Sequence, residues 1–317
     1  MISVHLDQGK VALQQTPKPE RPEGFALIRL IEGGICNTDL ELQRGYYGFS
    51  GTPGHEFVGE VVEADSKELL GKRVVGEINL SCGACSWCIR GLGRHCPGRS
   101  VLGIVRHPGA FREFLTLPER NLHVVPDSIP TENAVFTEPL AAACEILDQV
   151  HIPCSSPVAV LGDGKLGLLV SQVLQANSYR VHQFGRHREK LQIAERAGVT
   201  TEVRGENLPE AEYQWVVDAT GSQAGLHAAI RMLQPRGTLI MKSTVHGEIP
   251  LDTAPVIVNE ITLVGSRCGR FEPALELLER NVVDVASMIS ARMRLADAPA
   301  AFECAAQKGA MKVLLSN

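Results

Sequence analysis

The sequence predicts an α/β protein of two domains, one with a doubly wound parallel sheet and one rich in β-strands. Three observations predict this class. Short β-type runs separated by Gly, Pro and charged turn residues fill the first part of the chain. From Ser156 onward, strands alternate with amphipathic helices. The 317 residues, 44% hydrophobic and 21% charged, are enough for two ordinary globular cores.

The β-rich domain is predicted from four short runs of β-type sequence. They cover residues 25–35, 56–64, 72–78 and 111–118. Turn-forming and charged residues separate these runs, as is usual at strand ends.

The doubly wound domain is predicted from apolar runs that do not alternate, each followed by a helix. A parallel sheet whose two faces are both buried requires such runs. We expect strands at 157–164, 179–186, 213–221, 238–244 and 260–269, with helices at 165–177, 187–198 and 222–237. The tail then adds a helix at 271–283, a segment at 289–295 and a last strand at 311–317, which can return to the first domain.

Composition excludes several classes of partner. The net charge is −5, and Lys and Arg are interspersed with acids, so no broad basic surface is predicted for a nucleic acid or an anionic membrane. The N-terminus lacks the pattern of a signal peptide, and no stretch reaches the ~18 apolar residues of a membrane span. We therefore expect a cytoplasmic protein that acts on a small molecule.

Four of the nine cysteines form a tight cluster in a Gly-rich loop. Cys82, Cys85, Cys88 and Cys96 follow the spacing C-x2-C-x2-C-x7-C, which lets four thiolates converge on one tetrahedral zinc ion. Packing alone gives no reason for this spacing on a polar loop. Four sulfur ligands leave no open position, so we expect a structural zinc. An iron–sulfur cluster is the alternative, because thiolates alone do not fix the metal.

Three further segments carry single candidate ligands: Cys36 in GGICNTD, His55 and Glu56 in TPGHEFVG, and Glu138 in FTEPLAAA. Taken singly, each has a simpler explanation: a buried thiol, a hydrogen-bonded imidazole or a carboxylate at a helix start. Together, a thiolate, an imidazole and a carboxylate make a mixed set that leaves one zinc position open for water or an alcohol oxygen.

A G-x-G-x-x-G turn follows an apolar strand and opens a helix. Its glycines are Gly162, Gly164 and Gly167, with Lys165 and Leu166 before the last. The first two glycines permit a tight turn and close approach to a pyrophosphate, and the third permits strand–helix packing. In this context the turn indicates a Rossmann domain that binds a nicotinamide dinucleotide.

These motifs resemble the zinc-containing medium-chain dehydrogenases, and within them the polyol, sorbitol and threonine dehydrogenase branch. The resemblance covers nearly the whole chain through GGICNTD, GHEFVGEV, the cysteine loop, EPLAAA, VLGDGKLG and VVDATG. It implies a GroES-like catalytic domain of residues 1–139 and 268–317 and a Rossmann domain of residues 140–267, with the active site in the cleft between them. It also implies a homodimer or homotetramer.

The resemblance implies that a catalytic zinc is surrounded by Cys36, His55 and either Glu56 or Glu138, the latter bound directly or through water. Zinc lowers the pKa of a bound alcohol, whose alkoxide then gives hydride to the nicotinamide. The family has a hydroxyl beside the substrate oxygen, and Thr38 matches it, although a Thr here can also simply stabilise a turn. Where relatives often carry His to end the proton relay, this chain has Glu41, a carboxylate that can serve as the acceptor.

Cofactor specificity is predicted from the end of the second Rossmann strand. An NAD site has an acid there, but no acid precedes Glu189, and Gly185 takes the position of the family's usual Asp. Arg186 and Arg188 follow and suit the 2′-phosphate of NADP, which Arg binds bidentately. The alternative is that both arginines stack on adenine or face solvent and that NAD is also accepted.

The resemblance implies further cofactor contacts at Thr220 and Gly221 and, around the nicotinamide, at Ser266 and Arg267. We thus expect a zinc-dependent enzyme that transfers hydride between NADP(H) and a secondary alcohol or polyol, or its carbonyl product. A zinc-independent enone or imine reductase and a non-catalytic dinucleotide-binding regulator are the alternatives. No motif selects the substrate, although Tyr46, Tyr47 and Phe49 are candidate pocket walls.

Overall fold

The computed structural model describes residues 1–204, 208–244 and 248–317. The chain divides into two units, one of residues Met1–Glu138 with Ile289–Asn317 and one of residues Pro139–Met288. The second unit therefore includes residues 268–288, which the sequence analysis placed with the first domain. Within the described ranges, no helix is both long enough and apolar enough to span a membrane.

The first unit is built on a seven-stranded sheet with the order β10-β5-β4-β3-β18-β17, in which β9 also pairs with β3. Strand β3 is central because its side chains are buried along most of its length and it pairs with three other strands. The last strand of the chain, β18, pairs antiparallel with β3, so the tail does return to this unit. The strands of this sheet are β3 Phe25–Gly34, β4 Glu56–Glu63, β5 Arg73–Gly76, β9 Phe114–Pro118, β10 Leu122–Val124, β17 Ile289–Arg294 and β18 Lys312–Ser316.

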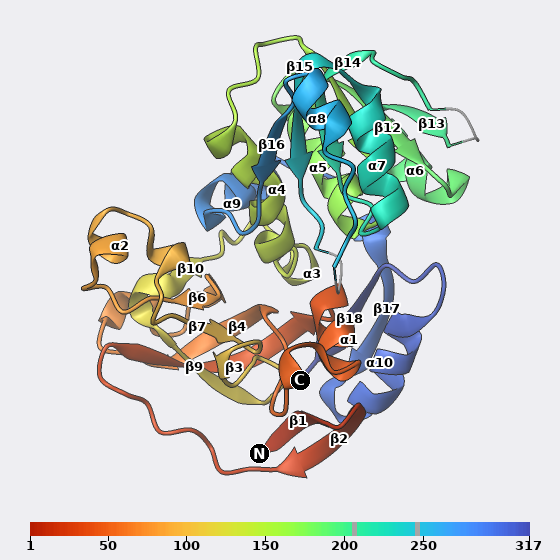
Figure 1. The fold of residues 1–317 in the computed structure, drawn as a ribbon. Coiled ribbons are helices and arrows are strands. Elements are labelled where there is room, and N and C mark those ends of the chain that lie inside the picture. Colours follow the sequence, from red (N-terminus) through yellow and green to blue (C-terminus); the bar gives the residue numbers. More distant parts are fainter. Residues whose placement is uncertain (205–207, 245–247) are drawn as a thin grey trace. The chain divides into compact units, whose positions relative to one another are not determined.

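Smaller elements complete the first unit (Figure 1). A hairpin and a three-stranded sheet of order β6-β7-β8 accompany the main sheet. Their strands are β1 Ile2–Asp7, β2 Lys10–Gln15, β6 Asn79–Leu80, β7 Ser100–Leu102 and β8 Arg106–His107. The helices are α1 Asn37–Gln43, α2 Ser86–Ile89, α3 Thr131–Ala134 and α10 Ala298–Ala306, and α4 Thr137–Gln149 begins here and continues into the second unit.

The second unit is a six-stranded sheet in which every pairing is parallel. Its order, β13-β12-β11-β14-β15-β16, is the 3-2-1-4-5-6 order of a dinucleotide-binding Rossmann sheet. Helix α5 packs on β11 and β12, and α7 packs on β14 and β15. The elements are β11 Pro157–Leu161, β12 Arg180–Gly185, β13 Thr200–Val203, β14 Tyr213–Asp218, β15 Leu233–Met241, β16 Thr262–Gly265, α5 Lys165–Ala176, α6 Arg188–Arg196, α7 Gln223–Met232, α8 Ala254–Val258 and α9 Phe271–Glu279.

This unit differs from the sequence prediction in several details: helices α4 and α8 were not predicted, and α9 ends at Glu279. The helix expected at 222–237 ends at Met232, and the following residues already belong to β15. Pro235 and Gly237 explain the early end, because both disfavour a helix interior. Strand β13 was not predicted, because its sequence, TTEV, has little apolar character. Three of its four residues are exposed.

Candidate active site

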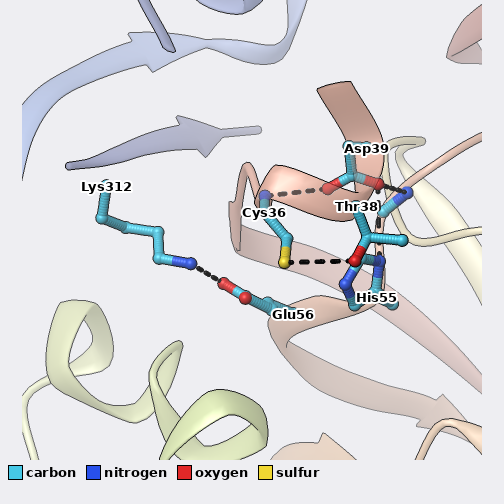
Figure 2. A network of polar contacts seen from close by, with 7 residues as sticks. Cys36, Thr38, Asp39, His55, Glu56 and Lys312 are labelled. Carbon is cyan, nitrogen blue, oxygen red and sulfur yellow. Dashed lines mark hydrogen bonds and ion pairs between the residues drawn. The ribbon is translucent and has the colours of Figure 1, made fainter. Parts of the chain in front are cut away.

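The first candidate ligand, Cys36, caps helix α1. Its backbone N–H donates to the carboxylate of Asp39 at 2.9 Å, which closes the first turn of the helix. The other oxygen of the Asp39 carboxylate accepts from the backbone N–H of Gly54 at 3.1 Å. Asp39 is fully buried, so one carboxylate joins the start of α1 to the loop before β4 (Figure 2).

Cys36, His55 and Glu56 come together, with one potential ligand atom from each within 4.8 Å of the others. His55 and Glu56 are almost fully buried at the start of β4, at 3% and 1% exposure. Thr38 Oγ1 lies 3.8 Å from Cys36 Sγ, so the predicted relay hydroxyl lies beside the cluster. The sequence-predicted thiolate, imidazole and carboxylate thus form one compact set.

Asp39 orients the imidazole of His55. Its Oδ1 lies 3.4 Å from His55 Nδ1, so we expect Nε2 to be the nitrogen that binds a metal. Burial lowers the pKa of His55, but the nearby Asp39 and Cys36 raise it, and the pKa lies well above the usual histidine value. Sequence reasoning missed Asp39, although it stands inside the GGICNTD motif at the third position of the helix, where it completes a capping box.

Lys312, which sequence reasoning also missed, forms an ion pair with Glu56, and both side chains are 1% exposed. A Cβ on Gly34 would lie 2.8 Å from Glu56 Oε2 and 3.1 Å from Lys312 Cδ, so this glycine leaves room for the pair. Burial lowers the pKa of Lys312, and the negative groups around it, Glu56 first, raise it above the usual lysine value. The available signal was a single Lys in the apolar strand MKVLLSN.

The donor set fits a zinc ion. Sulfur, imidazole nitrogen and carboxylate oxygen are the ligand types of catalytic zinc sites. Glu56 Oε1 is buried and has no hydrogen-bond partner within the described part of the chain. This oxygen is an unsatisfied acceptor that a bound cation would satisfy.

Two predicted residues lie apart from this set. Glu138, the second residue of α4, is half-buried and does not belong to the described cluster of Cys36, His55 and Glu56, so its role as a ligand stays a prediction. Glu41 accepts a hydrogen bond from Arg44 at 2.6 Å on the same helix, with 31% of its side chain exposed.

The cysteine loop gathers its four sulfurs into a tetrahedron. Cys85 caps the short helix α2, and the Sγ atoms of Cys82, Cys85, Cys88 and Cys96 lie 3.5 to 3.8 Å apart in the four recorded pairs. Four zinc–sulfur bonds of about 2.3 Å in tetrahedral geometry place the sulfurs about 3.8 Å apart. Hydrogen bonds from the backbone of Ala84 and Cys85 lower the pKa of Cys82 to about 6, which favours the thiolate.

The glycine-rich turn has the geometry that a dinucleotide requires. Gly162 has φ +124°, and a Cβ there would lie 2.7 Å from the carbonyl oxygen of Ala219. A Cβ on Gly167 would lie 2.3 Å from the carbonyl oxygen of Gly162, so the helix packs directly on the turn. Gly164 caps α5 and faces open space, which leaves the helix N-terminus accessible to a pyrophosphate. Lys165 and Leu166, both half-buried, form the first turn of α5.

The carboxyl ends of β11, β12 and β14 border a cavity of about 260 Å³. Its lining includes the predicted Gly185 and Arg186, together with Asp163, His187 and Arg204, which were not predicted as site residues. Arg204 directly follows β13, the strand that the sequence analysis did not find. Three groups with cationic or protonatable side chains thus surround this end of the cavity.

Asp163 explains why position 185 is glycine. A Cβ on Gly185 would lie 2.6 Å from Asp163 Cβ, so the Asp163 side chain fills the space that a strand-end acid would need. Its Oδ2 accepts from the backbone N–H groups of Arg186 and His187, each at 2.6 Å, and lies 3.0 Å from His187 Nδ1. A carboxylate is therefore present at the end of β12, but it comes from the glycine-rich turn and is occupied by local donors.

The remaining predicted cofactor residues follow β12, β14 and β16 in the chain. Arg188 is 58% exposed in its side chain, pairs with Glu195 of α6 at 2.7 Å and is not among the residues that line the cavity. Thr220 lines the cavity and donates to Asp218 at 2.8 Å, and Gly221 follows with φ +63°. Ser266 and Arg267 follow β16 directly, with Ser266 buried.

Comparison with known proteins identifies both halves of the chain. Residues 22–127 match the alcohol dehydrogenase GroES-like domain, and residues 166–284 match the zinc-binding dehydrogenase domain. A D-altritol 5-dehydrogenase of Agrobacterium fabrum is 30% identical over 310 residues, covering 92% of each chain. An L-threonine 3-dehydrogenase of Streptomyces avermitilis is 31% identical, covering 96% of this chain and 95% of its own. The solved structure of a proposed zinc-binding dehydrogenase from Sinorhizobium meliloti, bound to NADP, superposes with a TM-score of 0.91 at 26% identity and covers 100% of this chain and 99% of its own.

Proposed function

The chain belongs to the zinc-containing medium-chain alcohol dehydrogenase family, and on that premise we propose that it oxidises a secondary alcohol or polyol with NADP⁺, or reduces the matching carbonyl with NADPH. The observation that carries this proposal is the buried cluster of Cys36, His55 and Glu56, with the orphaned Glu56 Oε1 at its edge. Relatives named for altritol, sorbitol and threonine dehydrogenase activity support a hydroxylated small-molecule substrate.

In the proposed mechanism, Cys36, His55 and Glu56 would hold a zinc ion. Zinc at this cluster would supply Lewis acidity, which lowers the pKa of an alcohol or polarises a carbonyl. Asp39 fixes the imidazole of His55 in one orientation, and Lys312 fixes the carboxylate of Glu56. Because these groups are buried, they need little rearrangement when a substrate enters.

The substrate proton is proposed to leave through Thr38 and Glu41. Thr38 Oγ1 lies beside the cluster, 3.8 Å from Cys36 Sγ, and is placed to accept the alcohol proton. Glu41 is three residues further along α1, on the same face of the helix, and is partly exposed, so it can pass the proton to water. Its contact with Arg44 keeps a cation next to the carboxylate.

The preference for NADP is proposed from the cavity at the end of β12. Gly185 supplies no acid for the ribose hydroxyls, and the Asp163 carboxylate is occupied by the backbone N–H groups of Arg186 and His187. Arg186 and Arg204 line the same cavity and offer guanidinium groups to a 2′-phosphate. Arg188 pairs with Glu195 instead, so Arg204 replaces it in this proposal.

We also propose that the aromatic loop takes part in substrate binding, at a cavity whose lining does not include Cys36, His55 or Glu56. Tyr47 and Phe49 line a cavity of about 510 Å³, together with Arg106 and His107 from β8. Thr52, three residues before His55, lies on the same cavity wall. Hydroxyl, imidazole and guanidinium groups beside aromatic rings suit a polyol better than an apolar alcohol.

The experiment that tests the proposed function measures turnover on a panel of polyols, amino alcohols and ketones with NADP(H) and NAD(H), before and after zinc removal by a chelator. We expect alcohol oxidation with NADP⁺ that is lost with the metal and restored by zinc. Turnover that survives zinc removal would favour a zinc-independent reductase. Cofactor binding without turnover on any substrate would favour a regulator.

A further inference from the structure

Lys242 is a buried cation at the end of β15, outside the cavity described above. Only 7% of the residue is exposed. Its Nζ donates to the carbonyl oxygen of Ala142 at 2.5 Å, to Ser266 Oγ at 3.0 Å and to the carbonyl oxygen of Arg267 at 2.9 Å. Three oxygens around one nitrogen match the three N–H donors of an ammonium group.

These contacts join three segments of the second unit. Ala142 lies on α4, four residues, or about one turn, after the predicted ligand Glu138. Ser266 and Arg267 directly follow β16. The Lys242 side chain thus ties both segments to the end of β15, beside the backbone hydrogen bond that Ser266 N–H donates to the carbonyl oxygen of Met241 at 3.1 Å.

The position of Lys242 in the sheet indicates which part of the cofactor it serves. In a 3-2-1-4-5-6 sheet, a dinucleotide lies across the point where the strand order reverses, with one nucleotide on each half. The glycine-rich turn and the cavity of Gly185 belong to the β11–β13 half, which takes the adenosine part. The ends of β15 and β16 belong to the other half, which takes the nicotinamide.

We propose that Lys242 is a positioning residue for the nicotinamide half of the cofactor, acting through the backbone of α4 and of the segment Ser266–Arg267. This rests on the proposed function. A lysine is rarely buried unless its polar partners are specific, because burying the charge costs free energy. Without the ammonium, the carbonyls of Ala142 and Arg267 would lose a buried donor, and the segment Ser266–Arg267 would lose its side-chain link to α4.

The test is the variant Lys242→Met, which keeps most of the side chain's length and removes its donors. Binding of NADPH is followed by fluorescence, and binding of adenosine 2′,5′-bisphosphate, which lacks the nicotinamide half, by calorimetry. We expect the dissociation constant of NADPH to rise roughly tenfold, the effect of one lost buried hydrogen-bond partner. The constant for the bisphosphate is expected to change by less than about twofold.

Equal weakening of NADPH binding and bisphosphate binding would overturn the proposal, because a general structural role would affect both halves of the cofactor site alike. Unchanged NADPH binding would overturn it as well. Lys242→Gln, which keeps a shorter side chain with an amide donor, provides a second test if Lys242→Met does not fold. It is expected to change NADPH binding in the same direction by a smaller factor. Lys190→Met on α6 is the control, because it removes a lysine from the same unit without touching these segments.

Failure of the proposed function is distinguishable from failure of this inference. A wild-type protein that binds neither NADPH nor NADH would contradict the proposed function itself. A wild-type protein that prefers NADH would contradict only the NADP preference. In that case the binding measurements use NADH in place of NADPH and ADP-ribose in place of the bisphosphate. For Lys242→Met, the dissociation constant of NADH is then expected to rise while that of ADP-ribose changes little.

Discussion

Lys312 and Glu56 form a buried ion pair next to Cys36 and His55, and each of the two side chains is only 1% exposed. The pair ties the last strand of the chain to the start of β4, although the two residues are 256 positions apart. A lone carboxylate in this place would be costly, since burial disfavours the charged form. The ammonium group therefore holds the Glu56 carboxylate in place at the candidate zinc site.

Lys312→Met is expected to lower the free energy of unfolding by about 3–5 kcal/mol, because it leaves Glu56 as an unpaired buried charge. Denaturant titration checks this, and the double variant with Glu56→Gln should recover most of the loss. The control is Lys18→Met, whose partner Glu63 is exposed and whose loss should cost at most about 1 kcal/mol. A Lys312→Met protein as stable as the control would contradict the role of the pair.

Asp39→Asn is expected to weaken zinc binding at the Cys36 cluster by about 10–100-fold, because a neutral amide orients His55 less well and removes a negative charge from its neighbourhood. Residual zinc at increasing chelator concentration measures this. The control is Glu60→Gln on β4, which alters an exposed ion pair with Arg29 of β3. It should leave the zinc affinity unchanged. Equal chelator sensitivity of the Asp39 variant and wild type would show that Asp39 serves only to cap α1.

Arg186→Ala and Arg204→Ala are each expected to weaken NADPH binding roughly tenfold while changing NADH binding much less, since a charge-assisted contact to the 2′-phosphate is lost. Parallel fluorescence titrations with the two cofactors measure the difference. Arg188→Ala should have a small effect, because Arg188 pairs with Glu195. If Arg188→Ala has the largest effect of the three, the sequence-based choice of Arg188 is right and the geometric choice of Arg204 is wrong.

Gly185→Asp alone is expected to destabilise the protein without producing an NAD-specific site, because its Cβ would lie 2.6 Å from Asp163 Cβ. Combining it with Asp163→Gly removes the obstruction and places an acid on the strand, where it can bind the ribose hydroxyls. The double variant should therefore bind NADH more tightly relative to NADPH than wild type does. Tighter NADH binding by the single variant would show that Asp163 does not block this position.

Local sequence patterns were sufficient to predict the fold class, the cysteine tetrad and the glycine-rich turn. In each, the residues that act together are close in sequence, as Cys82 and Cys85 are, so spacing carries the information. The Cys36, His55 and Glu56 cluster needed the family resemblance as well, because its members come from separate segments.

The unpredicted site residues depend on tertiary contacts. Lys312 reaches Glu56 only because β18 pairs with β3, and no local pattern fixes that pairing. Asp163 fills the space at Gly185 because β11 and β12 are neighbours in the sheet. Arg204 enters the cavity from the end of β13, a strand too polar to recognise by periodicity.

The most direct test of the central claim is the zinc content of the purified wild-type protein and of its Cys36→Ser variant, measured by elemental analysis. We expect two zinc ions per chain in wild type and one in the variant, with no iron in either. This result would place one metal at the Cys36 cluster and one at the cysteine tetrad. A single zinc ion per chain in both proteins would mean that Cys36, His55 and Glu56 hold no metal, and would contradict zinc-dependent catalysis at this site.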